Sequence, residues 1–281
     1  MEHTRTCATN DVPAPSSVGQ TDVVTSSVET ADPPALHRGP EVLAVLGVSL
    51  GLSGVYALLS YLRAELTVKG GISATTATVA AGAQTSRMWL DIAYDLTAVV
   101  AGLMPVVLVL VLLSRDPRTA GFGIGLDRRP ARRELLLGAG FAALIGIPGL
   151  ALVWVAHLLG VSANLAVVDV PNTWYRVPLL LLQAAQNGAL EEIVVVGYLL
   201  TRLRQMGWSN GRALGASALL RGSYHLYQGL GGFAGNLVMG LVFAWWFQRT
   251  RRVVPLIVAH FLLDTFAFLG YLYLRSHVSW I

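Results

Sequence analysis

Long apolar runs separated by short polar segments set the pattern of this chain. Seven runs stand out, at roughly 41–62, 90–113, 134–160, 176–200, 213–230, 234–248 and 253–274. A helix needs about 20 apolar residues to cross the hydrocarbon core of a bilayer, and several of these runs reach or approach that length. The pattern therefore predicts an all-α fold, a polytopic transmembrane helical bundle of about seven spans with an eighth possible.

Composition supports a membrane protein. Hydrophobic residues make up 54% of the 281 residues, charged residues make up only 13%, and the mean hydropathy is +0.59. These values lie far outside the balance of a soluble domain. The basic residues fall in short clusters between apolar runs, which is typical of loops and excludes a nucleic-acid-binding surface. The single cysteine, Cys7, leaves neither a disulfide framework nor a cysteine-based metal site.

Three regions follow along the chain. Residues 1–38 are rich in Thr, Ser, Val, Pro and Asp and lack an apolar signal-peptide core, so we expect a disordered cytoplasmic tail. Residues 39–170 hold the N-terminal transmembrane spans, which carry almost no charge in their middles. Residues 171–275 hold the late spans, where charged side chains interrupt the apolar runs.

The basic residues also distinguish the two ends of the spans. Alternating the loops puts twelve arginines on one side: Arg115, Arg118, Arg128, Arg129, Arg132, Arg133, Arg202, Arg204, Arg212, Arg249, Arg251 and Arg252. The other side has five basic residues: Arg63, Lys69, Arg87, Arg176 and Arg275. Since cytoplasmic loops carry the excess of Lys and Arg, we expect a cytoplasmic N-terminus, an outside C-terminus and a place in the cell membrane.

Ionisable side chains inside three late spans are the first candidates for function. Glu191 and Glu192 are adjacent in the fourth run, His225 lies in the fifth, and His260 and Asp264 lie in the seventh. A charge in hydrocarbon costs a few kcal/mol and adjacent carboxylates repel, so these groups need partners or a shared proton. At 1.5 Å per residue, all five lie about 10 to 18 Å from the predicted cytoplasmic face. We therefore expect one polar cavity that opens toward the cytoplasmic half.

Such a cavity supports acid and base chemistry on water. A carboxylate near a second carboxylate can take a proton from water, while a histidine orients that water or donates to a leaving amine. His260 and Asp264 are four residues apart and share a helix face, so both can point toward one oxyanion.

Three motifs extend this interpretation. The segments EEIVVVGYL (191–199), RGSYHLYQG (221–229) and HFLLDTFAF (260–268) occur in that order on late spans. This ordered set resembles the CPBP family of intramembrane endopeptidases, which includes type II CAAX prenyl proteases and bacterial Abi proteins. The resemblance covers roughly residues 175–272 and implies that 171–275 forms an intramembrane protease core.

The resemblance also implies roles for individual residues. Glu191 would activate water with support from Glu192, His225 would be the water partner, and His260 with Asp264 would form the oxyanion site. It further implies a glutamic mechanism without a cofactor, a hydrophobic or lipidated peptide as substrate, and membrane lipids as surroundings.

Two positions depart from the family pattern. Val196 stands where the first motif usually has arginine, and Arg221 stands where the second usually has phenylalanine. Arg221 and His225 are four apart and share a helix face. We therefore hypothesise that Arg221, a possible auxiliary residue, supplies from the fifth run the guanidinium missing from the fourth.

Three alternatives stay open at this point. A metal-dependent enzyme would use Glu191, His225, His260 and Asp264 around zinc, although the chain has no HExxH helix. A proton-coupled carrier would use the same buried groups, although no internal repeat is evident. A catalytically silent immunity or scaffold protein is the third, because Val196 departs from the pattern.

Other polar residues have simpler interpretations. Asn187 and Gln183 share the Glu191 helix face and are expected to bond between helices. Asp91 and Asp95 lie near the outer start of the second run and are expected at the membrane interface.

Overall fold

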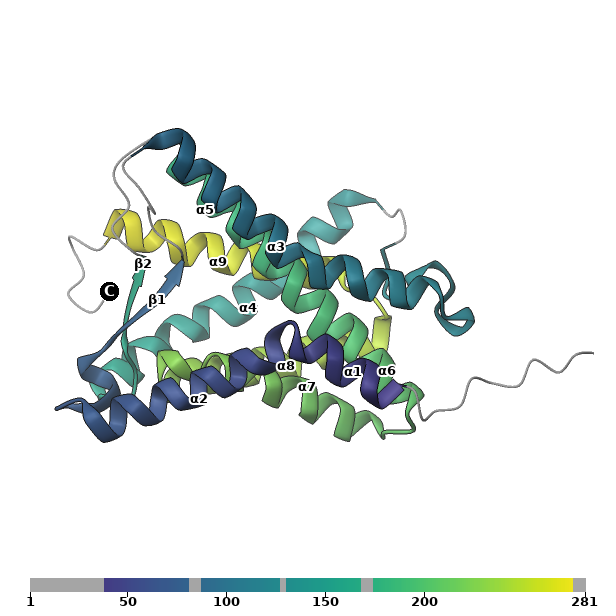
Figure 1. Cartoon of the computed structure of the whole chain (residues 1–281), viewed down its shortest axis with the longest axis horizontal. Coiled ribbons are helices and arrows are strands. Elements are labelled where there is room, and N and C mark those ends of the chain that lie inside the picture. Colours follow the sequence, from purple (N-terminus) through teal and green to yellow (C-terminus); the bar gives the residue numbers. More distant parts are fainter. Residues whose placement is uncertain (1–37, 81–86, 127–129, 168–173, 275–281) are drawn as a thin grey trace, which may run out of the picture. The chain divides into compact units, whose positions relative to one another are not determined.

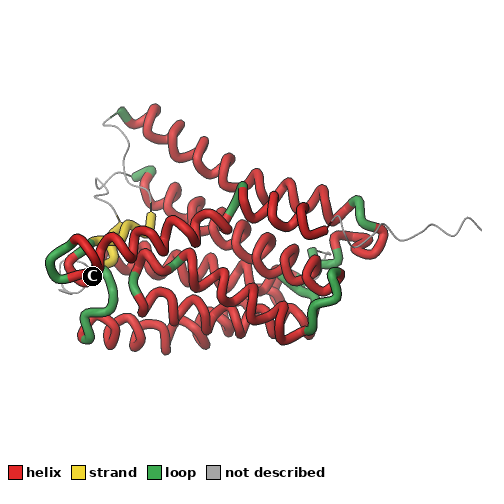
Figure 2. Tube along the Cα trace, turned by 60° about the horizontal axis from the view of Figure 1, so that its bottom comes forward, coloured by secondary structure: helices red, strands yellow, loops and turns green. Residues whose placement is uncertain are grey.

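Helices dominate the structure (Figure 1). The computed structural model describes residues 38–80, 87–126, 130–167 and 174–274. Its α-helices are α1 (Arg38–Gly47), α2 (Leu50–Thr67), α3 (Met88–Ser114), α4 (Ala131–Leu158), α5 (Arg176–Glu191), α6 (Leu199–Gln205), α7 (Asn210–Tyr224), α8 (Leu230–Thr250) and α9 (Val254–Leu274). The predicted all-α helical bundle is confirmed, and Figure 2 shows most helices running side by side. The predicted tail lies outside the described residues, except that Arg38 begins α1.

Not every predicted span is a full-length helix. Within the described residues, five stretches are long and apolar enough to cross a membrane: α3, α4, α5 to α6, α8 and α9. The first predicted span is α1 plus α2, which meet at a 54° bend. The fifth is α7, whose 15 residues fall short of the about 20 that a span needs. The fifth predicted run thus ends early, because α7 stops at Tyr224 and the chain turns at Gly229, where φ is +94°.

A π-helix interrupts the fourth span. The segment η4 (Glu192–Tyr198) joins α5 to α6, and its residues are all buried. A π-helix makes i to i+5 hydrogen bonds, so it changes which side chains share a face, and such segments often occur at functional sites. Here it begins at Glu192, directly after Glu191.

Two short strands add a feature that the hydropathy pattern did not predict. Strand β1 (Thr76–Ala80) pairs in parallel with β2 (Asn164–Val167), in register from Thr76 opposite Asn164. Three short 3-10 turns, η2 (Gly71–Ala74), η3 (Pro117–Phe122) and η5 (Leu226–Gln228), complete the described elements. The N–H of Ala163 donates to the carbonyl of Gln228 at 3.0 Å, so β2 begins beside the turn between α7 and α8.

Loops that alternation places on one side meet at one end of the bundle. Arg202 at the end of α6 donates to Glu41 of α1 at 2.8 Å and to Asp116 after α3 at 2.5 Å. Arg251 after α8 donates to Thr201 at 2.9 Å. These contacts agree with the alternation of loops deduced from the sequence.

Asp116 is the acidic centre of this end. Burial acts to raise its pKa, but the N–H of Arg118 and the side chains of Arg202 and Gln205 outweigh burial and hold the pKa below its usual value. Because the folded-state pKa is depressed, the resulting stability is present at neutral pH. It is lost as the pH falls through the acidic range in which folded Asp116 takes up a proton.

Asp91 and Asp95 differ from expectation. They lie near the start of α3, but they are buried against α5 rather than open to the interface, with exposed fractions of 0% and 2%. Arg176 of α5 donates to Asp95 at 3.0 Å and also pairs with Asp91, to which the Tyr175 hydroxyl donates at 3.3 Å. A buried charge is tolerated only with partners, so this cluster ties α5 to α3.

Glycine permits the close contact between α5 and α9. A Cβ at Gly188 would lie 3.2 Å from the carbonyl oxygen of Ile257 and 3.5 Å from the Cβ of His260. The missing side chain thus lets the two backbones approach, one turn before Glu191. The contact brings the fourth predicted span against the seventh.

We expect Gly188→Leu to lower the thermal unfolding midpoint in detergent, because the new side chain has no space between α5 and α9. Overpacking of this kind costs about 1 to 3 kcal/mol. Gly140→Leu is the matched control, because a Cβ at Gly140 of α4 would meet nothing within 4 Å. Equal midpoints for the two variants would contradict this packing.

Candidate active site

Residues from three helices converge around the end of α5. Glu191 is the last residue of α5 and Glu192 the first of η4. Arg221 lies in the last turn of α7, and His225 follows that helix as its C-cap. The third contributor is α9, with the pair His260 and Asp264. The following contacts join these residues into one cluster.

Glu192 is the buried centre of the cluster. Its Oε1 accepts from Nη2 of Arg221 at 2.5 Å and lies 2.7 Å from Nδ1 of His260. Glu192 and Arg221 have no exposed surface, and His260 is only 3% exposed. A carboxylate in such a place needs a cation and a hydrogen-bond donor, and here it has both. Glu192 therefore links α5, α7 and α9 and has no surface left for a substrate.

The contact to Glu192 orients His260. With Nδ1 on the carboxylate, the other nitrogen, Nε2, lies 3.6 Å from Oδ1 of Asp264. A carboxylate on one imidazole nitrogen fixes the ring and the proton position on the other. His260 is thus held with Nε2 toward the partly exposed Asp264, whose side chain is 23% exposed.

Glu191 has a different environment from its neighbour. The Tyr224 hydroxyl donates to its Oε2 at 2.7 Å, and Nη1 of Arg221 lies 3.6 Å from the same oxygen. Its side chain keeps 11% exposure, whereas that of Glu192 keeps none. The two adjacent carboxylates are therefore distinct: Glu192 is enclosed in an ion pair, and Glu191 is buried but keeps a small exposed area.

His225 lies beside this pair. Its Nδ1 is 3.0 Å from the backbone carbonyl of Arg221, and its ring packs on that of Tyr224 with centroids 4.8 Å apart. An N–H on Nδ1 donating to the carbonyl leaves Nε2 as the free nitrogen. No hydrogen bond joins His225 to Glu191 within the part of the chain that the structure describes. The predicted role of His225 as the water partner requires a water between its ring and the Glu191 carboxylate.

Asp264 has a partner that the motif comparison did not supply. Nδ2 of Asn187 lies 3.4 Å from its Oδ2, which joins α5 to α9. The expected interhelical bond of Asn187 is therefore present. Gln183, one turn earlier on α5, is buried as well.

Arg221 lies where the hypothesis requires it, with its guanidinium reaching the end of the fourth predicted span from the fifth. Val196 is fully buried among apolar side chains, whereas the guanidinium of Arg221 reaches Glu192 from α7. The ring of Phe243 lies 5.6 Å from the guanidinium carbon and covers one side of it. A catalytic role for this charge stays a prediction.

Tyr224 is the contact of this site that motif reasoning missed. A tyrosine in an apolar helix is equally compatible with packing, so its type alone carries no signal. Its spacing does carry one: Tyr224 is three residues after Arg221 and therefore on the same face of α7.

The zinc alternative needs Glu191, His225, His260 and Asp264 to converge on one point. Among the described residues, no group of three or more His, Cys, Asp and Glu side chains is arranged to hold a metal ion. Of the four proposed ligands, His260 already has Nδ1 2.7 Å from Oε1 of Glu192.

Comparison with known families gives one match. Residues 172–266 match the family model described as type II CAAX prenyl endopeptidase Rce1-like, and this segment runs from α5 into α9. Comparisons with curated proteins and with solved structures found no match. The matched helices contain all of the clustered residues described above. Through these helices, the chain is similar to the Rce1-like family of type II CAAX prenyl endopeptidases, and its apolar helices make it an integral membrane protein.

Proposed function

We propose that this chain is a glutamic-type intramembrane endopeptidase. It would hydrolyse a peptide bond of a membrane-associated or lipidated peptide in the cytoplasmic half of the bilayer. The observation that carries this proposal is the difference between the adjacent carboxylates: Glu192 is held between Arg221 and His260, while the Glu191 side chain keeps 11% of its surface exposed. The family match over residues 172–266 supports peptidase chemistry.

In the proposed reaction, Glu191 takes a proton from a water held between it and His225. The water oxygen attacks the carbonyl carbon of the scissile bond and forms a tetrahedral oxyanion. When the C–N bond breaks, the proton on Glu191 passes to the leaving nitrogen, either directly or through His225. The products are a carboxylic acid and an amine, and transfer of the acid proton to the amine gives a carboxylate and an ammonium group, so atoms and charge balance.

The developing oxyanion would be met from α9. His260 lies between the carboxylates of Glu192 and Asp264, and an imidazolium with N–H groups on both nitrogens satisfies both sides. Its Nε2–H is then the donor for the oxyanion. Asp264, held by Asn187, would orient this group or, when protonated, donate a second hydrogen bond.

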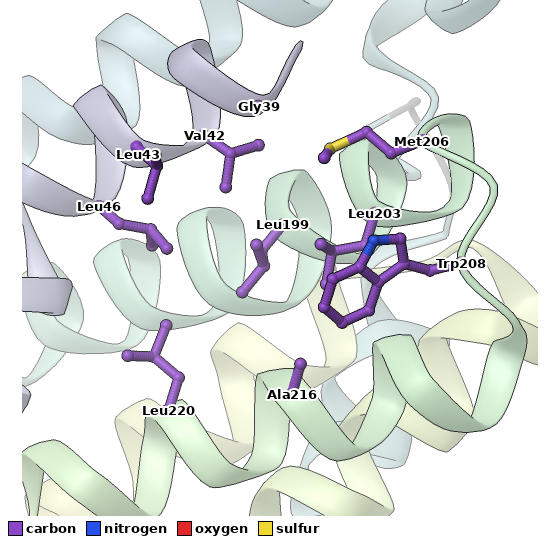
Figure 3. A pocket seen from close by; sticks show the side chains of 10 residues that line it. All are labelled: Gly39, Val42, Leu43, Leu46, Leu199, Leu203, Met206, Trp208, Ala216 and Leu220. Carbon is purple, nitrogen blue, oxygen red and sulfur yellow. The ribbon is translucent and has the colours of Figure 1, made fainter. Parts of the chain in front are cut away.

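An apolar groove supports a lipidated or hydrophobic peptide as substrate (Figure 3). The groove has a volume of about 370 Å³ and runs between α1, α6 and α7. Its lining residues are Gly39, Val42, Leu43, Leu46, Leu199, Leu203, Met206, Trp208, Ala216 and Leu220. Leu220 directly precedes Arg221, so one end of the groove adjoins the helix that carries the ion pair. A hydrocarbon chain fits this chemistry better than a polar one.

Orientation in the cell membrane is part of the proposal. The arginine-rich end of the bundle would face the cytoplasm, with the N-terminus on the same side and the C-terminus outside. Exposed arginines at this end include Arg115, Arg204, Arg212 and Arg249. Anionic lipid of the inner leaflet would attract them.

We expect the activity of the purified protein to resist metal chelators, because the proposed mechanism needs no bound metal. The measurement compares peptide cleavage rates before and after exhaustive treatment with chelator, followed by zinc addition. Unchanged rates are the expected result. Loss of cleavage that zinc restores would move the protein to the metal-dependent class.

A further inference from the structure

We infer that Tyr224 is a positioning residue that holds the Glu191 carboxylate so that one oxygen faces water. This inference rests on the proposed function and adds a residue to it. Tyr224 lies outside the motif positions to which the family resemblance assigns roles. The inference rests on the geometry at the end of α7.

The hydrogen bond is short and buried. The Tyr224 hydroxyl donates to Oε2 of Glu191 at 2.7 Å, and Tyr224 is only 6% exposed. A hydroxyl donating to a charged carboxylate makes a stronger hydrogen bond than two neutral groups do. Burial keeps water from competing for the donor.

The contact also selects one oxygen of the carboxylate. Arg221 approaches the same Oε2 at 3.6 Å, so both close polar contacts of Glu191 among the described residues meet that oxygen. The other oxygen, Oε1, is left for the attacking water. A carboxylate fixed at one oxygen presents the second in a defined direction, which is the requirement for a general base.

Arg221 and Tyr224 of α7 therefore contact different carboxylates. Arg221 makes its closest contact to Glu192 at 2.5 Å, and Tyr224 makes the hydrogen bond to Glu191. The two residues are three apart and share one helix face, so one turn of α7 serves both carboxylates. This division keeps Glu192 in a permanent ion pair while Glu191 exchanges its proton.

Other titratable groups surround Glu191 and stay in place when Tyr224 changes. From α7 and its cap come Arg221 and His225, from η5 comes Tyr227, and from α9 come His260 and Asp264, with Glu192 next in the chain. Loss of the Tyr224 hydroxyl removes one donor to the ionised carboxylate. Protonation of Glu191 then becomes easier, so activity is lost at a higher pH.

Tyr224→Phe tests the inference directly. We expect kcat to fall about tenfold to a hundredfold, KM to stay within about twofold, and the acidic limb of the pH–rate profile to move up by about one unit. Tyr227→Phe is the matched control, because the Tyr227 hydroxyl accepts from Gln228 and, among the residues that the structure describes, donates to no carboxylate. Unchanged kcat and an unchanged acidic limb in folded Tyr224→Phe would overturn the inference.

A second variant distinguishes loss of the hydrogen bond from misfolding. Difluorotyrosine at position 224 keeps the size of the side chain and makes its hydroxyl a stronger donor. The acidic limb should then move to lower pH, opposite to Tyr224→Phe. A shift in the same direction for both variants would contradict the hydrogen bond.

An infrared titration separates this inference from the proposed function. The carboxylic acid band of Glu191 is assigned by its absence from Glu191→Gln, and its titration is followed in the resting protein. The band should appear at higher pH in Tyr224→Phe than in the wild type. If no peptide is cleaved, the proposed function fails, yet this shift still supports the contact; coincident titrations overturn it.

Discussion

Replacing Glu191 with glutamine reduces peptide cleavage by about a hundredfold to ten-thousandfold, the usual contribution of a general base. Glutamine keeps the size of the side chain and can still accept from the Tyr224 hydroxyl, so the fold is preserved. It cannot take a proton from water. The measurement is kcat/KM on a hydrophobic or lipidated peptide by purified protein in detergent.

The control for this variant is Glu65→Gln. Glu65 is an exposed carboxylate of α2 that accepts from the N–H of Ile72 at 3.3 Å, far in sequence from the cluster. We expect wild-type kinetics from it. Retention of more than about a tenth of the wild-type kcat/KM by Glu191→Gln would remove Glu191 from the role of base, since tenfold is below the range for such a group.

Arg221→Ala has the second large effect. It leaves Glu192 buried without its cation, which costs about 3 to 5 kcal/mol of stability. Without Arg221, the Glu192 carboxylate that orients His260 is no longer held in place. Cleavage should therefore fall to a level comparable with Glu191→Gln. Arg221→Lys keeps the charge but loses the two-pronged guanidinium, so we expect an intermediate loss. Thermal unfolding and kcat/KM measure the two effects separately.

A double variant distinguishes stability from catalysis at this position. Glu192→Gln with Arg221→Met removes both charges of the closest ion pair, and the unfolding midpoint should return toward the wild type because no charge at position 192 is left buried without its cation. Cleavage should stay low, since His260 has lost the carboxylate that orients it. Full activity of Arg221→Ala would refute the hypothesis that α7 supplies the missing guanidinium. Strictly additive losses of stability in the double variant would refute it as well.

Much of the bundle could be predicted because a bilayer constrains sequence strongly. Backbone groups in hydrocarbon must bond within a helix, so apolar runs translate directly into helices such as α3, α4 and α9. The meeting of Glu191, Glu192, His225, His260 and Asp264 followed from a similar constraint, because charged side chains turn to the interior. Composition and depth were enough for these features.

Other features depend on packing that hydropathy does not encode. The π-helix at Glu192–Tyr198 reads as an ordinary apolar helix in sequence, and the 54° bend between α1 and α2 occurs inside one apolar run. Arg176 and Asp95 lie near span ends, where charges usually meet headgroups, so their burial against one another was not evident. Such contacts depend on how two helices are rotated relative to each other, which the hydropathy pattern does not give.

The pairing of Arg221 with Glu192 lies between these cases. Spacing along α7 suggested that a guanidinium there could replace the family arginine, and the structure places it 2.5 Å from the carboxylate. The Tyr224 contact could have been reached by the same spacing, but tyrosine also packs well without a polar role. Chemistry that depends on an unusual residue is easier to predict than chemistry from a common one.

The most direct measurement is cleavage of lipidated and unmodified hydrophobic peptides by the wild-type protein in proteoliposomes, with products identified by mass spectrometry. We expect one internal peptide bond to be cut, giving a matched pair of fragments, and no cut by Glu191→Gln. Absence of any cleaved product from folded protein, while Glu191→Gln leaves its cellular effect unchanged, would contradict an endopeptidase and point to a silent scaffold.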